Sequence, residues 1–212
     1  MRALLSGDDR GYHGAAYRLA PGIRLRYRLP DRLPPLLVGT WGARGAALAG
    51  EIADEVKVGG SANPAVVPLI RDRVWVGCQA AHRPLDQIKV VVGAVTVVDE
   101  DGTAARRRAR TEVATYLAVV AELDATSELP AGFADRLRGL VAAGDIEAAG
   151  ALIPDEVLDR FAFSGTPEHV AALAQRVLDA GAGRVDFGTP HGLSDGAGLA
   201  LLGATVLPLL RR

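Results

Sequence analysis

Short apolar runs alternate with stretches of helical periodicity along most of the chain. The runs are continuous and rich in β-branched residues, which is typical of strands buried on both faces. They predict four strands, at residues 36–39, 55–60, 88–98 and 184–188. Apolar residues recur at helical spacing between and after these strands, and the predicted helices lie at residues 46–53, 64–81, 167–180, 198–210 and in a long segment after Asp99. This order predicts one α/β domain, built as a parallel sheet or a barrel segment, with a helical insertion at residues 123–163.

Turn and cap residues set the ends of two of these helices. Asn63 before Pro64 predicts a helix N-cap followed by proline in the first turn, and Thr166 before Pro167 predicts another. Gly181 is expected to close the second helix.

The first 34 residues follow a different pattern. Strict apolar/polar alternation at residues 23–29, after Pro21 and Gly22, predicts one strand of a hairpin, and residues 17–19 supply a second alternating piece. We therefore expect a hairpin segment at residues 1–34 and the β/α units of the domain at residues 35–212.

Charge and composition exclude several classes of function. The 212 residues contain 24 Lys and Arg against 25 Asp and Glu, a net charge of −1, which gives no whole-chain reason to bind nucleic acid or an acidic membrane. A single cysteine, Cys78, excludes an intramolecular disulfide, and the four histidines lack the spacing of metal ligands. No apolar run reaches the ~18 residues of a membrane span. We expect a cytoplasmic protein without a metal site.

The carboxyl ends of the predicted strands are where parallel α/β folds bind ligands. The first end is a small-residue loop that runs into a helix and comprises Gly39, Thr40, Trp41, Gly42, Ala43 and Arg44. Glycines allow close backbone approach, helix-start N–H groups favour an anion such as phosphate, and Arg44 adds a positive charge. The alternative is a simple tight turn with a solvated Arg44.

Two further strand ends carry weaker signals. Thr189 and His191 follow the last predicted strand, and a histidine that titrates near neutral pH there is a candidate for contacting substrate or cofactor. An ordinary loop is the alternative. The glycine-rich end at residues 58–61 is interpreted as a turn. Arginines at residues 106–110 are interpreted as a solvated helix face rather than a nucleic-acid site.

Two stretches go beyond composition. Residues 35–44 contain Leu-Leu-Val-Gly-Thr-Trp-Gly-Ala-Arg and continue through Leu-Ala-Gly-Glu-Ile-Ala-Asp at residues 48–54. Residues 165–192 begin Gly-Thr-Pro-Glu-His-Val and end Phe-Gly-Thr-Pro-His-Gly. Together they resemble the bacterial luciferase-like superfamily, most of all its deazaflavin-dependent 5,10-methylenetetrahydromethanopterin reductase branch. Ala43 and Glu55 stand where that family usually has Pro and Gly, and Arg44 keeps the positive charge.

The resemblance implies a TIM-type (β/α)8 barrel in which residues 36 onward match strands five to eight. Strands one to four are then expected to be absent, and residues 1–34 to match the family's insertion segment. The implied activity is that of an oxidoreductase using coenzyme F420 (a deazaflavin) or FMN for hydride transfer or monooxygenation of a small molecule. The loop around Gly42 would lie on the phosphate side of the cofactor, and no catalytic residue is assigned.

Such a carboxyl-terminal half would need to cover its open sheet edges. A homo-oligomer or a complementing amino-terminal half is the expected partner. The alternative function is a non-catalytic half-barrel, or a truncated fragment, that needs a partner chain.

Overall fold

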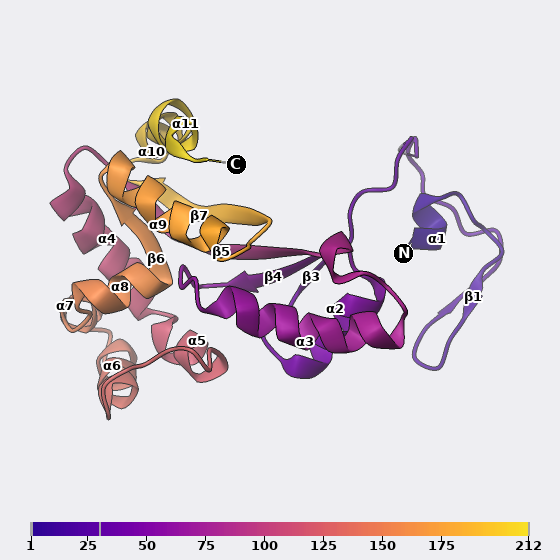
Figure 1. Cartoon of the computed structure of the whole chain (residues 1–212), viewed down its shortest axis with the longest axis horizontal. Helices are drawn as coiled ribbons and strands as arrows, with labels where there is room; N and C mark the ends of the chain where they lie inside the picture. Colours follow the sequence, from indigo (N-terminus) through magenta and orange to yellow (C-terminus); the bar gives the residue numbers. More distant parts are fainter. Residues whose placement is uncertain (1, 30, 212) are drawn as a thin grey trace. The chain divides into compact units, whose positions relative to one another are not determined.

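The computed structural model describes residues 2–29 and 31–211, which fall into two units divided between Leu36 and Leu37 (Figure 1). The first unit contains α1 (Arg2–Leu5) and an antiparallel pair, β1 (Tyr12–His13) and β2 (Arg18–Leu19). The antiparallel pair thus joins residues 12–13 to residues 18–19, and both the strand predicted at residues 23–29 and its place in the hairpin are wrong. Its alternating apolar side chains, such as Ile23 and Tyr27, are exposed, and alternation specifies a strand only where one face is buried.

Four parallel strands form the body of the second unit. Their order is β3 (Leu37–Gly39), β4 (Glu55–Gly59), β5 (Lys89–Val98) and β7 (Arg184–Gly192). A fifth strand, β6 (Ala162–Gly165), pairs with the last four residues of β5. The register places Gly59 of β4, Gly93 of β5 and Asp186 of β7 in one row across the sheet.

These strands confirm the predicted parallel α/β sheet with two differences. β7 extends four residues beyond the predicted end, so Thr189 and His191 belong to a strand rather than to a loop. β6 was not predicted, because its four residues lie inside a segment of helical composition. In the described part of the chain β3 pairs only with β4, and β7 only with β5, so each keeps one edge without a strand partner.

Helices cover one face of this sheet. α2 (Ala43–Ile52), α3 (Val66–Ala80) and α9 (Pro167–Asp179) pack there over a core that includes Val56 and Val58. After β7 the chain ends in α10 (Asp195–Leu201), a π-helical turn (Leu202–Val206) and α11 (Leu207–Leu209). On β4 the alternation leaves Glu55, Lys57 and Gly59 facing away from this core.

Helix starts depart from the sequence pattern at α2, at α3 and at α10, which begins at Asp195 rather than at residue 198. α2 begins at Ala43, three residues before the predicted start, so Ala43 and Arg44 lie in its first turn. Asn63 does not cap α3, which begins at Val66. Its side chain instead accepts a hydrogen bond from the backbone N–H of Ala65, as in a turn. Thr166 caps α9 as predicted, accepting from the N–H of His169.

The predicted helical insertion forms a second core over the carboxyl half of β5. Within residues 123–163 lie α6 (Phe133–Ala142), α7 (Ile146–Ala151) and α8 (Asp155–Phe161), and α4 (Gly102–Ala114) and α5 (Leu117–Leu123), which begin before this segment, pack into the same core. A short 3₁₀ turn (Leu85–Gln87) precedes β5. The helices in the described residues lack the length and apolarity needed to cross a membrane.

Candidate functional site

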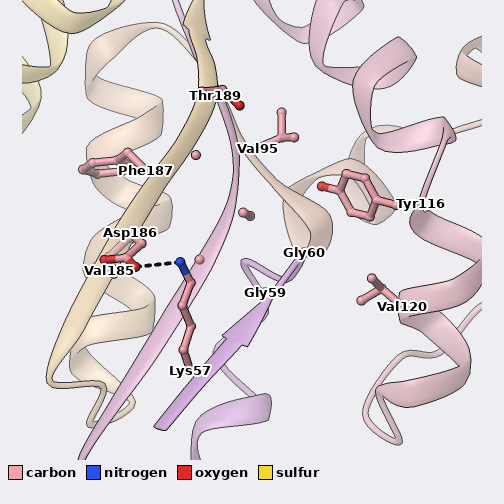
Figure 2. A pocket seen from close by; sticks show the side chains of 13 residues that line it. Lys57, Gly59, Gly60, Val95, Tyr116, Val120, Val185, Asp186, Phe187 and Thr189 are labelled. Carbon is pink, nitrogen blue, oxygen red and sulfur yellow. Dashed lines mark ion pairs between the residues drawn. The ribbon is translucent and has the colours of Figure 1, made fainter. Parts of the chain in front are cut away.

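A pocket of about 650 Å³ lies on the sheet face opposite α2, α3 and α9 (Figure 2). Its lining comes from β4, β5 and β7 and from the region where α5 begins. The volume falls within the range of about 300–1,000 Å³ common for small-molecule sites. The pocket therefore occupies a face of the sheet that the first core leaves open.

Small residues form the floor of this pocket, namely Gly59, Gly60, Gly93, Ala94 and Gly188. Gly60 has a positive φ of 80°, and a Cβ there would lie 2.8 Å from a methyl carbon of Val120. Its N–H donates to the carbonyl of Gly93, which turns the chain over β5 at the end of β4. Glycine is required by both the backbone and the space.

Apolar side chains form one wall. Figure 2 shows Val95, Tyr116 and Val120 on the side of the pocket away from Asp186. The Tyr116 hydroxyl donates to the carbonyl of Phe161 at 2.8 Å. Burial raises the pKa of the Tyr116 hydroxyl well above its ordinary value of 10.0, so this wall stays uncharged.

Charged side chains form the opposite end. The Lys57 ammonium lies 2.8 Å from the Asp186 carboxylate, and the Arg184 guanidinium forms a second ion pair with Asp186 at 3.1 Å. Arg184 contacts Glu55 at 3.1 Å. The four residues carry two positive and two negative charges and lie on β4 and β7, the two strands that flank β5. Lys57 and Asp186 are each about one-third exposed and both line the pocket.

The sequence-predicted loop at Gly39–Arg44 lies beside this pocket without lining it. The N–H of Thr40 donates to the carbonyl of Lys57, and the Trp41 indole N–H donates to the carbonyl of Gly59, at 2.9 and 3.1 Å. The Trp41 carbonyl accepts from Arg73. The bulky Trp41 side chain therefore packs toward the core and ties the loop to the pocket floor.

The start of α2 is open to an anion. Gly42 is the N-cap and provides no side-chain cap, and a Cβ on Gly39 or Gly42 would meet open space. The N–H groups of residues 43–45 have no acceptor within the described residues. Arg44 is exposed, and its side chain has no ion-pair or hydrogen-bond partner among the described residues. These donors and this charge suit a phosphate.

Of the two candidates on β7, only Thr189 lies at the pocket. Thr189 lines the pocket and is exposed. His191 pairs in register with Val97 on β5, has a positive φ of 76° and does not line the pocket. The geometry thus brings Thr189, but not His191, to the same cavity as Lys57.

Of the residues that line the pocket, only Thr189 was a candidate from the sequence. Lys57 and Asp186 stand out once the strands are aligned, and Tyr116 reaches the pocket from the start of α5. A signal was present, because Glu-Val-Lys-Val and Arg-Val-Asp-Phe each alternate charged and apolar residues at 55–58 and 184–187. Such alternation marks a polar sheet face.

Other parts of the molecule are weaker candidates. A pocket of about 410 Å³ lies where α4 and α9 begin, but its cation, Arg106, is engaged by Asp155 and Asp159 at 2.8 and 2.6 Å. Within the described ranges, His, Cys, Asp and Glu nowhere gather in threes as a metal site would require. The first pocket is the candidate site.

Comparisons with known proteins relate the chain to one group. A family model described as luciferase-like monooxygenase matches residues 1–184. The 5,10-methylenetetrahydromethanopterin reductase of Methanolobus tindarius is 26% identical over 210 residues, and that of Archaeoglobus fulgidus is 27% identical over 216. These matches cover 98% and 100% of this chain, but 63% and 64% of the relatives.

A solved structure shares the fold. The coenzyme F420-dependent tetrahydromethanopterin reductase from Methanopyrus kandleri superposes with a TM-score of 0.86 at 23% identity. The superposition covers 99% of this chain and 60% of that one. The chain therefore spans somewhat less than two-thirds of the length of the proteins it matches.

Proposed function

Because the chain belongs to the luciferase-like monooxygenase family, we propose that it is an oxidoreductase that binds coenzyme F420 or FMN and acts on a small molecule. The observation that carries this proposal is the pocket beside the uncapped start of α2, joined to it by the Trp41–Gly59 hydrogen bond. A ring and a phosphate of one cofactor need two adjoining sites of this kind.

The phosphate site comprises Gly39, Thr40, Trp41, Gly42, Ala43 and Arg44. The N–H groups at the start of α2 and the Arg44 guanidinium would hold the phosphate, with Gly42 allowing close approach. Ala43, in place of the proline usual in the family, does not disturb the turn, because the helix begins at this residue.

The ring site is the 650 Å³ pocket, in which the small-residue floor suits a planar ring. A bound deazaflavin or flavin supplies the redox chemistry, while the protein positions the ring and substrate. Val95, Tyr116 and Val120 would exclude water on one side, and Thr189 offers a hydroxyl at the rim. His191 lies on β7, one residue beyond Pro190, and does not line the pocket.

F420 is favoured over FMN. Two curated relatives that match nearly the whole chain are named methylenetetrahydromethanopterin reductases, and the solved reductase is named as F420-dependent. Family membership and the pocket also favour an oxidoreductase over a non-catalytic half-barrel.

The free edges of β3 and β7 support a partner that continues the sheet. This partner is a second copy of the chain or a complementing segment that supplies the barrel's other strands. Its presence would also cover Lys57 and Asp186, which are each about one-third exposed in the described part of the chain.

Fluorescence titration with F420 and with FMN tests the proposal. We expect saturable binding of at least one cofactor, with F420 binding more tightly. Arg44→Ala should weaken that binding by about ten- to a hundredfold, because charge-assisted hydrogen bonds to the phosphate are lost. Binding of neither cofactor by the folded chain would contradict the assignment.

A further inference from the structure

The charged end of the pocket offers a donor and an acceptor side by side. Lys57 has three N–H donors, and its Nζ lies 2.8 Å from Oδ2 of Asp186 in an ion pair. Asp186 forms ion pairs with Lys57 through Oδ2 and with Arg184 through Oδ1, and each carboxylate oxygen keeps further capacity to accept a hydrogen bond. Figure 2 shows the two side chains meeting at the pocket surface.

Gly93 makes this arrangement possible. Lys57 and Asp186 belong to strands on opposite sides of β5, and they meet over Gly93. A Cβ on Gly93 would lie 3.0 Å from Cε of Lys57 and 3.1 Å from Cβ of Asp186. Because Gly93 has no side chain, Lys57 and Asp186 can meet across β5. Both side chains still line the pocket.

The balance of charge selects the kind of group that can bind. An anion placed against Lys57 would also lie close to the Asp186 carboxylate, so attraction and repulsion would largely cancel. The next two charges, Arg184 and Glu55, also sum to zero. A neutral carbonyl avoids this conflict, because it gains a charge-assisted hydrogen bond from Lys57 without repulsion from Asp186. An N–H next to that carbonyl would meet the remaining acceptor capacity of Asp186.

We propose that Lys57 and Asp186 recognise the amide or imide edge of a ring heterocycle, with Lys57 donating to C=O and Asp186 accepting from N–H. The inference rests on the proposed function, because it gives the pocket a ring to bind. A flavin or deazaflavin ring and a pterin ring carry this edge in common, so the source of the edge is decided by experiment.

The lysine content of the chain allows a direct test on the unaltered protein. Its two lysines are Lys57 and Lys89. Lys89 begins β5, is exposed and lies outside this pocket. Reductive methylation, read by mass spectrometry at each lysine, is compared without ligand, with lumiflavin and with 6-methylpterin. We expect at least one ring to lower labelling of Lys57 severalfold and leave Lys89 unchanged.

Ligand and protein variants test the two hydrogen bonds separately. N3-methyllumiflavin keeps the carbonyl groups but lacks the imide N–H, and it should bind about tenfold more weakly than lumiflavin. Lys57→Met should weaken the binding of lumiflavin by a similar factor. The matched control, Lys89→Met, should leave this binding unchanged. Urea unfolding of both variants confirms that each is folded.

The outcomes separate this inference from the proposed function. Protection by lumiflavin places the cofactor ring at the pair, and protection by 6-methylpterin alone places a substrate ring there. Ring binding with Lys57 still fully labelled, or equal affinity for the N3-methyl compound, would overturn the inference and leave the proposed function standing. Failure of F420, FMN, lumiflavin and 6-methylpterin to bind would overturn both.

Discussion

Lys57 of β4 and Asp186 of β7 form an ion pair, with Nζ 2.8 Å from Oδ2, across the strand that lies between them. Gly93 of that middle strand lies beneath the contact. The ion pair links the polar face of the sheet across three strands. It also places a hydrogen-bond donor and an acceptor at one end of the pocket.

Gly93→Ala tests how closely this crossing is packed. The new methyl group would press on Lys57 and Asp186 at 3.0–3.1 Å, so we expect a loss of about 1–3 kcal/mol in the free energy of unfolding. Gly59→Ala is the matched control, because Gly59 lies next to Gly93 in the register and its Cβ would meet open space. Urea denaturation should show the control unchanged or slightly stabilised. Equal effects would contradict the packing described for Gly93.

The contact between α2 and α3 predicts an unusual response to alanine. Alanine favours helices over glycine by about 1 kcal/mol, but a Cβ on Gly77 of α3 would fall 1.7 Å from the carbonyl oxygen of Ala47 on α2. We expect Gly77→Ala to destabilise the protein by at least about 2 kcal/mol. Gly139→Ala in α6, where a Cβ meets nothing within 4 Å, should instead stabilise it. Thermal unfolding of both variants measures the contrast, and stabilisation by Gly77→Ala would refute the close contact.

Continuous apolar runs made the sheet predictable. The run at 88–98 became β5 almost unchanged, because a strand covered on both faces carries its signal in every residue. β6 was not predicted, because a strand of four residues is too short to show a clear strand periodicity. Residues 23–29 alternate apolar and polar side chains as a strand would, but their apolar side chains are not buried against a core, so no strand forms.

The candidate site was only partly predictable for a related reason. Gly39–Arg44 carries a local signal, glycines before a helix start. Lys57 and Asp186 lie 129 positions apart in the numbering. Their contact depends on the register of three strands, and single-chain periodicity does not define that register.

The Arg106–Asp155 contact predicts a pH dependence of stability. A hydrogen bond from Arg106, aided by the charges of Arg106 and Arg110, holds the pKa of Asp155 below its ordinary value of 3.8 against the opposing effect of burial. A depressed pKa adds stability above the unfolded-state pKa and loses it as the pH falls through the folded-state value. Asp155 is two-thirds exposed, so Asp155→Asn should cost no more than about 1 kcal/mol at pH 7.

The cost of Asp155→Asn should shrink as the pH is lowered from about 5 to about 2. Urea unfolding across this range provides the measurement. Glu156→Gln is the control, because Glu156 is exposed beside Asp155 and has no ion-pair partner in the described residues. A cost for Asp155→Asn that stays constant over the whole range would show that the carboxylate charge is not its origin.

The free strand edges predict association. Light scattering should give a mass above the 22.1 kDa of one chain. Leu37→Lys on the edge strand β3 should reduce that mass, because charged lysines on an edge oppose strand pairing. Leu48→Lys on the exposed side of α2 is the control and should leave it unchanged. A wild-type monomer at micromolar concentration would contradict this prediction.

Gly42→Asp separates helix stability from anion binding. Gly42 has extended φ and ψ of −74° and 145° and open space for a side chain. Aspartate there should cap α2 and raise stability by a few tenths of a kcal/mol. Its charge should also repel a phosphate, so FMN affinity is expected to fall. Unfolding and titration of the same variant test both effects, and unchanged FMN affinity would exclude phosphate from this helix start.

The preference for FMN over riboflavin tests the central claim most directly, because the two ligands differ only in the phosphate. We predict that the wild-type chain binds FMN at least about tenfold more tightly than riboflavin, since Arg44 and the start of α2 hold the phosphate. Arg44→Ala should reduce this preference severalfold while leaving riboflavin affinity unchanged. An FMN-to-riboflavin ratio that is the same in wild type and Arg44→Ala would contradict the account.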